Sequence, residues 1–162
     1  MVPIELLLTS LTGPQLNSDA AVRAGCDKIG LGAVIRDASG RVAAAVSKSV
    51  AGTVIAELGE LLALKEGLLL AKTFNLFIPM AEVDASNVAS MLNSDVSSLS
   101  DAFLLINDIK GLCKVVGDCR CQAISRLGNS LAHHLAALAF SYVQRQVWEN
   151  VHPICIISLS LL

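Results

Sequence analysis

The chain has 162 residues, of which 54% are hydrophobic and 16% are charged, and its net charge is −2. This length allows one domain with a substantial core, and the composition excludes a disordered chain, which needs low hydrophobicity and high charge. The negative net charge argues against strong non-specific binding of nucleic acid, because lysine and arginine side chains drive such binding.

A mean hydropathy of +0.63 raises the alternative of a membrane protein. A membrane-spanning helix needs about 20 consecutive apolar residues. Residues 58–71 contain charged side chains, and the apolar run at residues 154–162 is too short. The N-terminus also lacks the basic segment of a secretory signal. We therefore expect an intracellular protein of the cytoplasm or nucleus, neither secreted nor held in a membrane.

The five cysteines do not follow a recognisable zinc or disulfide pattern. Cys119 and Cys121 are separated by one residue, which suits neither a tight disulfide nor the C-x-x-C metal knuckle. Buried thiols in a reducing compartment are the simplest interpretation.

The first part of the chain predicts three strands joined by short turns. Residues 1–14 form a leader without clear periodicity, and residues 15–22 resemble a short strand. The second strand, residues 29–36, contains two glycines at which another backbone could approach closely. A tight-turn signal at residues 37–40 then leads into a third strand at residues 41–49. Strands connected in this way are antiparallel neighbours.

The remainder predicts helices alternating with strands. Apolar residues at helical spacing predict the longest helix at residues 54–73. The later elements are a strand at 76–83, a helix at 85–92, a helix at 102–116 capped by Ser100, a strand at 119–124 and a helix at 129–143. This order predicts an α/β domain with a mixed five-stranded sheet, three antiparallel strands and then two parallel ones, flanked by helices. The domain would occupy residues 15–145, and residues 146–162 would be an apolar tail.

Three carboxylates stand out by their positions. Asp19 lies in the first strand between small residues, Glu60 lies on an otherwise apolar helix face, and Asp84 ends a strand. Acidic groups in apolar surroundings are costly unless they are paired, hydrogen-bonded or bound to a cation. If they converge, they could hold Mg²⁺, which prefers oxygen ligands, and two such ions can activate water for phosphodiester cleavage.

Each of these carboxylates also has an ordinary structural interpretation. Asp84 could cap the following helix, Glu60 could be a solvated edge residue, and Asp19 could lie on an exposed strand face. Periodicity alone therefore supports only a mixed α/β domain in which acidic residues could cluster.

An ordered series of short motifs runs from about Gln15 to the end of the chain. It comprises Leu-Asn-Ser-Asp-Ala-Ala at residues 16–21, Gly-Leu-Gly-Ala-Val-Ile-Arg-Asp at 30–37, Glu-Leu-Leu-Ala-Leu-Lys-Glu-Gly-Leu at 60–68, Glu-Val-Asp-Ala-Ser-Asn-Val at 82–88, and Asn129 followed by Ala-His-His-Leu-Ala at 132–136. This series resembles the ribonuclease H type-1-like domain of the plant retrotransposon-derived, reverse-transcriptase-related family. Each motif is short, and their order makes the resemblance specific.

The resemblance implies a ribonuclease H-like fold that cuts the RNA strand of an RNA–DNA hybrid with metal-activated water. It implies that Asp19, Glu60 and Asp84 are catalytic, metal-binding acids, with Mg²⁺ as the ion and Mn²⁺ as the alternative. His133 takes the fourth catalytic and metal-binding position, which is aspartate in many ribonucleases H. A histidine there adds no negative charge and suits Mg²⁺ poorly.

The resemblance also implies that Asn17, Arg126 and Asn129 bind the substrate. The partner would be an RNA–DNA hybrid or another nucleic acid, recognised through the 2′-hydroxyl groups of one strand and the shape of the other. The sequence leaves the oligomeric state open.

The chain departs from the family pattern around the helix that carries the glutamate and near the last strand. Gly59 replaces a common alanine, and a glycine within a helix costs about 1 kcal/mol. Glu57 lies one turn before Glu60 and is the alternative ligand, but Gly67, seven residues after Glu60 on the same face, favours Glu60. Ala123 stands where the family usually has a histidine that helps protonation or product release.

Three functions are compatible with these observations. The first is an active metal-dependent ribonuclease, which the retained acids favour because a pure nucleic-acid binder gains nothing from negative charge near phosphates. The second is a catalytically decayed domain that only binds nucleic acid. The third is a protein-interaction module, which the low charge favours.

Overall fold

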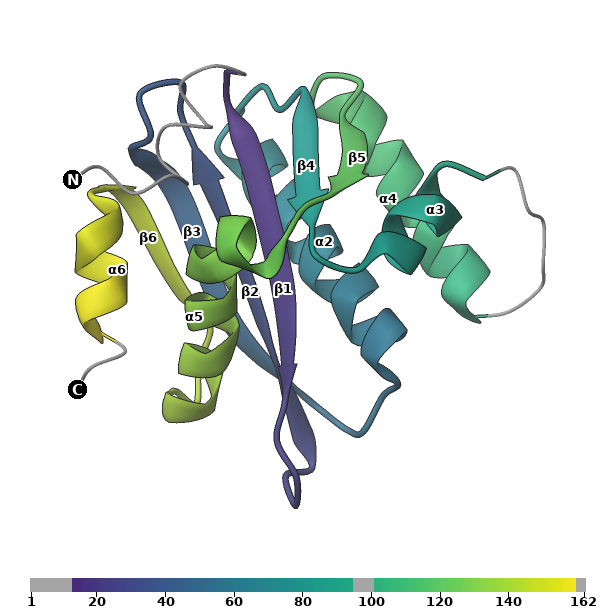
Figure 1. Cartoon of the computed structure of the whole chain (residues 1–162), viewed down its shortest axis with the longest axis vertical. Coiled ribbons are helices and arrows are strands. Elements are labelled where there is room, and N and C mark those ends of the chain that lie inside the picture. Colours follow the sequence, from purple (N-terminus) through teal and green to yellow (C-terminus); the bar gives the residue numbers. More distant parts are fainter. Residues whose placement is uncertain (1–12, 95–100, 160–162) are drawn as a thin grey trace.

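The computed structural model describes residues 13–94 and 101–159, so the expected cap at Ser100 and most of the expected leader lie outside the described residues. Six strands form one mixed sheet with helices on both faces (Figure 1). The strands are β1 (Gln15–Val22), β2 (Lys28–Arg36), β3 (Val42–Ala51), β4 (Met80–Val83), β5 (Arg120–Ala123) and β6 (Gln146–Val151). They lie in the order β5-β4-β1-β2-β3-β6.

Four helices follow the predicted order, and α6 is a further helix within the segment expected to be a tail. They are α2 (Ala56–Thr73), α3 (Ser86–Leu92), α4 (Asp101–Val115), α5 (Ser130–Leu138) and α6 (Pro153–Leu159), with 3₁₀ turns η1 (Arg126–Asn129) and η2 (Ala139–Ser141). The strand expected from residue 76 begins only at Met80, directly after Pro79, whose missing N–H removes a ladder donor. Within the described ranges, no helix is long and apolar enough to cross a membrane.

The predicted mixture of strand directions is confirmed. β1, β2 and β3 pair antiparallel, and β4 and β5 continue the sheet from β1 in parallel. The predicted number of strands is wrong, because the expected tail supplies a sixth strand. β6 pairs antiparallel with β3, with Val42 opposite Val151 and Ser47 opposite Gln146.

Side chains of β2 alternate between two cores, one on each face of the sheet. Ala33 and Ile35 face the larger core, which α2 and α4 complete. Val34 faces the opposite core, where it packs with residues of α5 and with Ile156 of α6. Near-continuous burial along β2 is expected for a strand covered on both faces.

Two glycines of β2 allow α5 to lie directly against the sheet. A Cβ at Gly30 would come within 2.0 Å of the Ala136 carbonyl oxygen, and a Cβ at Gly32 within 2.3 Å of the Ala136 nitrogen. The close backbone approach expected from the sequence is therefore confirmed. It brings α5, and with it His133, close to β1.

Candidate active site

The site forms at the edge of β1 that faces β4. β4 pairs with only the first three residues of β1, so the later part of this edge has no strand partner among the described residues. Side chains replace the missing strand. The Ala20 N–H donates to Glu60 Oε1 at 3.3 Å, and the Ser18 carbonyl accepts from Asn129 Nδ2 at 2.9 Å. Because β4 is short, backbone groups of β1 are left without a strand partner, and the side chains of Glu60 and Asn129 form hydrogen bonds with them.

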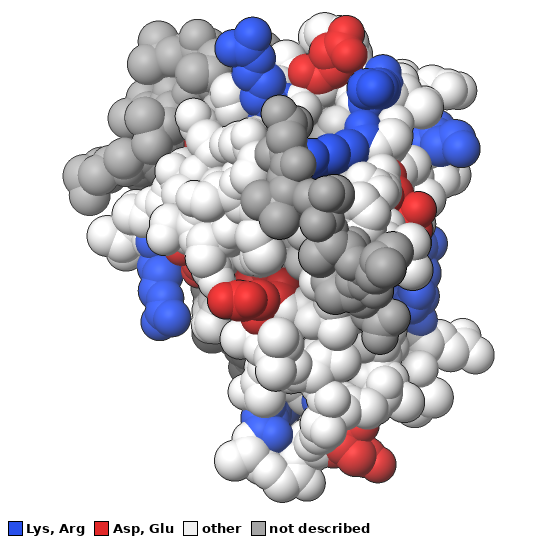
Figure 2. All heavy atoms as spheres, turned by 90° about the vertical axis from the view of Figure 1, so that its right-hand side faces the viewer, with Lys and Arg blue, Asp and Glu red and all other residues white. Residues whose placement is uncertain are grey.

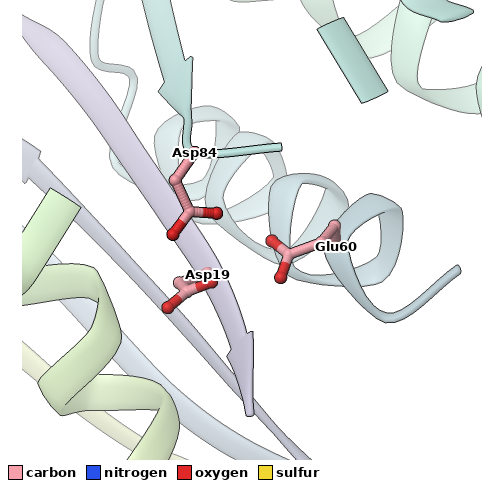
Figure 3. Close-up of side chains that lie close together, drawn as sticks. All are labelled: Asp19, Glu60 and Asp84. Atoms are coloured by element: carbon pink, nitrogen blue, oxygen red, sulfur yellow. The ribbon is translucent and has the colours of Figure 1, made fainter. Parts of the chain in front are cut away.

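Three carboxylates converge at this open edge (Figure 3). Asp19 comes from β1, Glu60 from α2, and Asp84 from the residue after β4. Each offers an oxygen that lies within 4.8 Å of those of the other two. We call these three residues the acidic cluster. The predicted convergence on one place is confirmed.

The helix register predicted for α2 is also confirmed. Glu60 points into the acidic cluster, whereas Glu57 is exposed and accepts a hydrogen bond from Asn87. Gly59 lies against Ala20 of β1, and a Cβ at Gly59 would be 3.3 Å from the Ala20 Cβ. The missing side chain therefore lets α2 close on β1 at the point where Glu60 meets the Ala20 N–H.

His133 reaches the cluster from α5. Its Nδ1 lies 2.8 Å from Asp19 Oδ2, although the imidazole is 66% exposed. His133, the fourth residue predicted from the sequence, thus lies beside Asp19 and close enough to Asp84 to affect its pKa. Ala123 also lies near the acidic cluster. It is the last residue of β5 and pairs with Val83 of β4, and Asp84 follows Val83 directly. The methyl group of Ala123 can neither donate nor accept a proton.

Burial and mutual repulsion disturb the ionisation of Glu60. Its pKa is raised from 4.5 to about 9, by burial first and then by the neighbouring Asp19 and Asp84. The hydrogen bond from the Ala20 N–H acts in the opposite direction and is outweighed. Carboxylates that share a site in this way favour protonation or a bound cation.

The pKa of Asp84 is raised as well, by burial and then by the charge of Asp19. The charges of Arg126 and His133 lower it and offset part of this effect. Arg126 is exposed at the start of η1, and its positive charge acts on Asp84. The site therefore combines a negative centre with a cationic group beside it.

The donor set fits a hard divalent cation. Within the part of the chain that the structure describes, Glu60 Oε2 is buried without a hydrogen-bond partner. Such an atom is costly unless something binds it. Carboxylate oxygens are the ligands that Mg²⁺ and Mn²⁺ prefer, so Asp19, Glu60 and Asp84 can together satisfy an ion of this kind.

Two of the residues expected to bind substrate lie inside the protein. Asn17 and Asn129 are fully buried and joined by a hydrogen bond of 3.2 Å. Arg36, which is not among the residues predicted from the sequence, donates to Asn17 Oδ1 at 2.9 Å and is itself buried. This network ties β1 and β2 to the start of α5. A substrate role for the two asparagines stays a prediction. The sequence signal for the network is Arg36, a charged residue at the end of an otherwise apolar strand.

Comparison with known proteins supports the fold. A family model described as reverse transcriptase-like matches residues 17–139. A search of curated proteins finds no match. The N-terminal RNase H domain of a Mycobacterium tuberculosis protein is 21% identical, with a TM-score of 0.66 over 79% of this chain and 93% of that one. RNase H1 of Halobacterium salinarum is 20% identical, with a TM-score of 0.66 over 79% and 97%.

A third similar structure was solved with nucleic acid. LC11-RNase H1, isolated from compost, was crystallised in complex with an RNA/DNA hybrid. In that complex it is 17% identical to this chain, with a TM-score of 0.69 over 79% of this chain and 96% of that one. At these identities the likeness establishes a ribonuclease H-like fold.

Proposed function

The chain belongs to the reverse transcriptase-like family, and from this membership we propose that it is a divalent-metal-dependent ribonuclease that hydrolyses the RNA strand of RNA–DNA hybrids. The observation that carries the proposal is the acidic cluster, whose three carboxylates present oxygens within 4.8 Å of one another. The hybrid bound by LC11-RNase H1, which shares the fold, supports the choice of substrate.

In the proposed enzyme, Asp19, Glu60 and Asp84 hold Mg²⁺ or Mn²⁺. When bound, such an ion supplies an activated water molecule and neutralises charge that develops on the phosphate. The protein contributes rigid placement. Asp19 lies in a strand paired with β2, and Glu60 is fixed by the Ala20 N–H. Groups that are already oriented cost little reorganisation during the reaction.

His133 is proposed as the fourth residue of this site. Its Nδ1 contacts Asp19, so a proton on Nδ1 would be donated to the Asp19 carboxylate and would orient it. A neutral imidazole suits Mn²⁺ better than Mg²⁺. We therefore propose that the enzyme prefers Mn²⁺.

Substrate contact is proposed for Arg126, whose side chain is exposed and whose charge lowers the pKa of Asp84. A cation in this position suits a phosphate oxygen, and phosphate contacts fix the position of a nucleic acid. Asn17 and Asn129 are proposed to act in substrate binding through the shape of the edge that they support. Figure 2 shows lysine and arginine scattered over the face that carries α3 and α4, with acidic side chains among them and near the middle of the face. With a net charge of −2, we expect modest affinity that falls with salt.

The test is cleavage of a labelled RNA–DNA hybrid by the purified protein in Mg²⁺, in Mn²⁺ or in chelator. We expect shortened RNA only with a divalent ion. Asp19→Asn should abolish cleavage, because it removes a negative ligand from the centre of the cluster. Glu57→Gln is the matched control, since Glu57 lies on the same helix outside the cluster, and it should cut like the wild type.

The same samples distinguish the alternatives. Hybrid that is shifted in a gel but not shortened would identify a decayed nucleic-acid binder. No shift and no cleavage would favour a protein-interaction module. If Asp19→Asn cuts as well as the wild type, the activity belongs to another site or to a contaminant.

A further inference from the structure

Three of the five cysteines gather where α4 ends and β5 begins, at a place separate from the acidic cluster. Cys113 lies in α4, Cys119 precedes β5 and Cys121 lies within β5. The Cys119 N–H donates to the Cys113 carbonyl at 3.0 Å. The intervening turn contains Gly117 and Asp118, both with positive φ, which folds the chain back sharply. Residues six apart in the sequence are therefore direct neighbours.

The cysteines line a surface cavity with a basic rim. The cavity has a volume of about 390 Å³, and its walls include all three cysteines together with Lys110, Lys114 and Arg120. Cys113 and Cys119 are partly exposed, whereas Cys121 is buried in the larger core. Basic side chains lie at the top of the face shown in Figure 2, the end of the molecule at which α4 meets β5 (Figure 1). A small oxidant can thus reach two adjacent thiols.

We propose that Cys113 and Cys119 form a disulfide when the protein meets hydrogen peroxide, so that this cavity is an oxidation site. A disulfide requires Cα atoms about 4.4–6.8 Å apart. A direct backbone hydrogen bond between the two residues brings their Cα atoms close to this separation. The third thiol, Cys121, is a poorer partner because the core covers it.

The chemical environment assigns different roles to the two thiols. Hydrogen bonding with the Cys119 side chain lowers the pKa of Cys113, although burial opposes the effect. The same hydrogen bond, together with burial, raises the pKa of Cys119. Burial raises the pKa of Cys121 to about 12. The thiolate is the reactive form. Cys113 is partly exposed in the wall of the cavity, and we therefore assign it as the nucleophile.

The reaction balances as two displacements. The Cys113 thiolate attacks one oxygen of hydrogen peroxide, the O–O bond breaks, and the departing hydroxide takes up the proton that the thiol released and leaves as water. This step makes a sulfenic acid. The Cys119 sulfur then attacks the Cys113 sulfur, the S–O bond breaks, and a second water leaves with the Cys119 proton. Two thiols lose two electrons, and one peroxide is reduced to two waters.

The test uses the full chain treated with hydrogen peroxide without any nucleic acid, so it is independent of the proposed ribonuclease activity. Titratable thiols should fall from the five cysteines of the chain to three. The intact mass should fall by two hydrogen atoms, and peptide mapping should find Cys113 linked to Cys119. Dithiothreitol should reverse all three changes.

Single substitutions define the order of events. Cys119→Ser should abolish the cross-link and leave a sulfenic acid on Cys113 that dimedone traps. Cys155→Ser is the matched control, because Cys155 is exposed and distant in the fold from β5, and it should keep the cross-link. A wild-type map without a Cys113–Cys119 link, or with oxidation only at Cys155, overturns the proposal. The wild-type map gives this answer whether or not a variant folds.

Discussion

Glu60 carries the largest electrostatic penalty in the acidic cluster, because it is buried beside two other carboxylates. Its pKa in the folded protein is about 9, against 4.5 for an ordinary glutamate. Between these values the folded state holds a proton that the unfolded chain has released. A folded state that binds more protons loses stability as the pH rises. The metal-free protein should therefore become less stable as the pH rises from about 5 to 9.

The first prediction follows from this sign. Glu60→Gln removes the titrating group and should raise the melting temperature of the metal-free protein by several degrees at pH 8, since each kcal/mol shifts it by about 2–4 °C at this chain length. The variant should also flatten the decline with pH in thermal melts. Glu57→Gln is the control, because Glu57 is exposed, and it should follow the wild type. An equally steep decline in Glu60→Gln would show that Glu60 does not control it.

Added Mg²⁺ offers an independent measurement on the same variants. A ligand that binds only the folded state raises the melting temperature. We expect Mg²⁺ to stabilise the wild type and Glu57→Gln clearly, and Glu60→Gln much less, because the neutral amide contributes no charge to the ion.

The second prediction concerns His133 and Ala123, two residues at the site. We expect weak cleavage that is stronger in Mn²⁺ than in Mg²⁺, because His133, as the proposed fourth ligand, would offer a nitrogen atom. Ala123 cannot give the proton assistance that a histidine at this position would give, which is typically worth a factor of about 10² to 10⁴. His133→Asp and Ala123→His should each raise the rate in Mg²⁺. His134→Asp makes the same chemical change one residue along α5 and should not. Equal rates in both metals, with no gain from Ala123→His, would contradict this account.

At the residue scale, the sequence predicted the three acids of the cluster but not the buried hydrogen-bond network of Asn17, Asn129 and Arg36 beside them. Asp19, Glu60 and Asp84 could be placed because their motifs occur in order along the chain. The burial of Asn17 and Asn129 could not be foreseen, because it depends on a contact between segments that lie 112 residues apart in the chain. A residue's own neighbours in the sequence do not encode such a contact.

Among the elements, the contact between α5 and β2 positions His133. The third prediction concerns Gly32→Ala. The added Cβ would lie 2.3 Å from the Ala136 nitrogen and 2.5 Å from the Ala132 carbonyl oxygen, both backbone atoms that cannot rotate away. The helix must shift, so we expect a loss of about 1–3 kcal/mol in denaturant unfolding, as for other overpacked sites. Hybrid cleavage should also fall as His133 moves from Asp19.

Gly111→Ala is the matched control for this substitution. Gly111 lies in α4, and a Cβ there would meet nothing within 4 Å. The change should stabilise the protein by up to about 1 kcal/mol, since alanine is the better helix former. Equal effects of the two substitutions would mean that α5 does not lie against β2 as described.

The elements themselves show which sequence signals are reliable. The spacing of Gly30 and Gly32 correctly predicted a close backbone approach, and the turn at residues 37–40 correctly predicted a hairpin. The final helix was expected to reach residue 143 but ends at Leu138, followed by the short turn η2. Apolar composition continues through this region, so periodicity alone could not locate the end.

At the level of the whole molecule, the last segment completes the second core. β6 covers the edge of β3, and Ile156 of α6 packs with Val34 and Leu131 on the α5 face of the sheet. The sequence alone predicts only an apolar tail at residues 146–162, because Gln-Val-Trp-Glu-Asn-Val lacks a clean alternation and its partner strand is far away in the chain. A domain boundary at residue 145 stays a prediction. Substitution of Ile156, which packs in the second core, tests it directly.

The last prediction compares two isoleucines of α6 that differ in burial alone. Ile156 is 1% exposed and Ile154 is 64% exposed. Truncating a buried isoleucine to alanine costs about 2–5 kcal/mol because it removes apolar contacts and leaves a cavity. Ile156→Ala should therefore lower the melting temperature by roughly 4 °C or more, whereas Ile154→Ala should leave it within the error of the measurement. Circular dichroism melts of the two variants beside the wild type provide the comparison.

If neither substitution lowers the melting temperature, the cooperatively folding domain ends near residue 145 and α6 does not belong to it. If only Ile156→Ala destabilises, the unit that unfolds as one body extends from β1 through α6, and the acidic cluster depends on a sheet that includes β6.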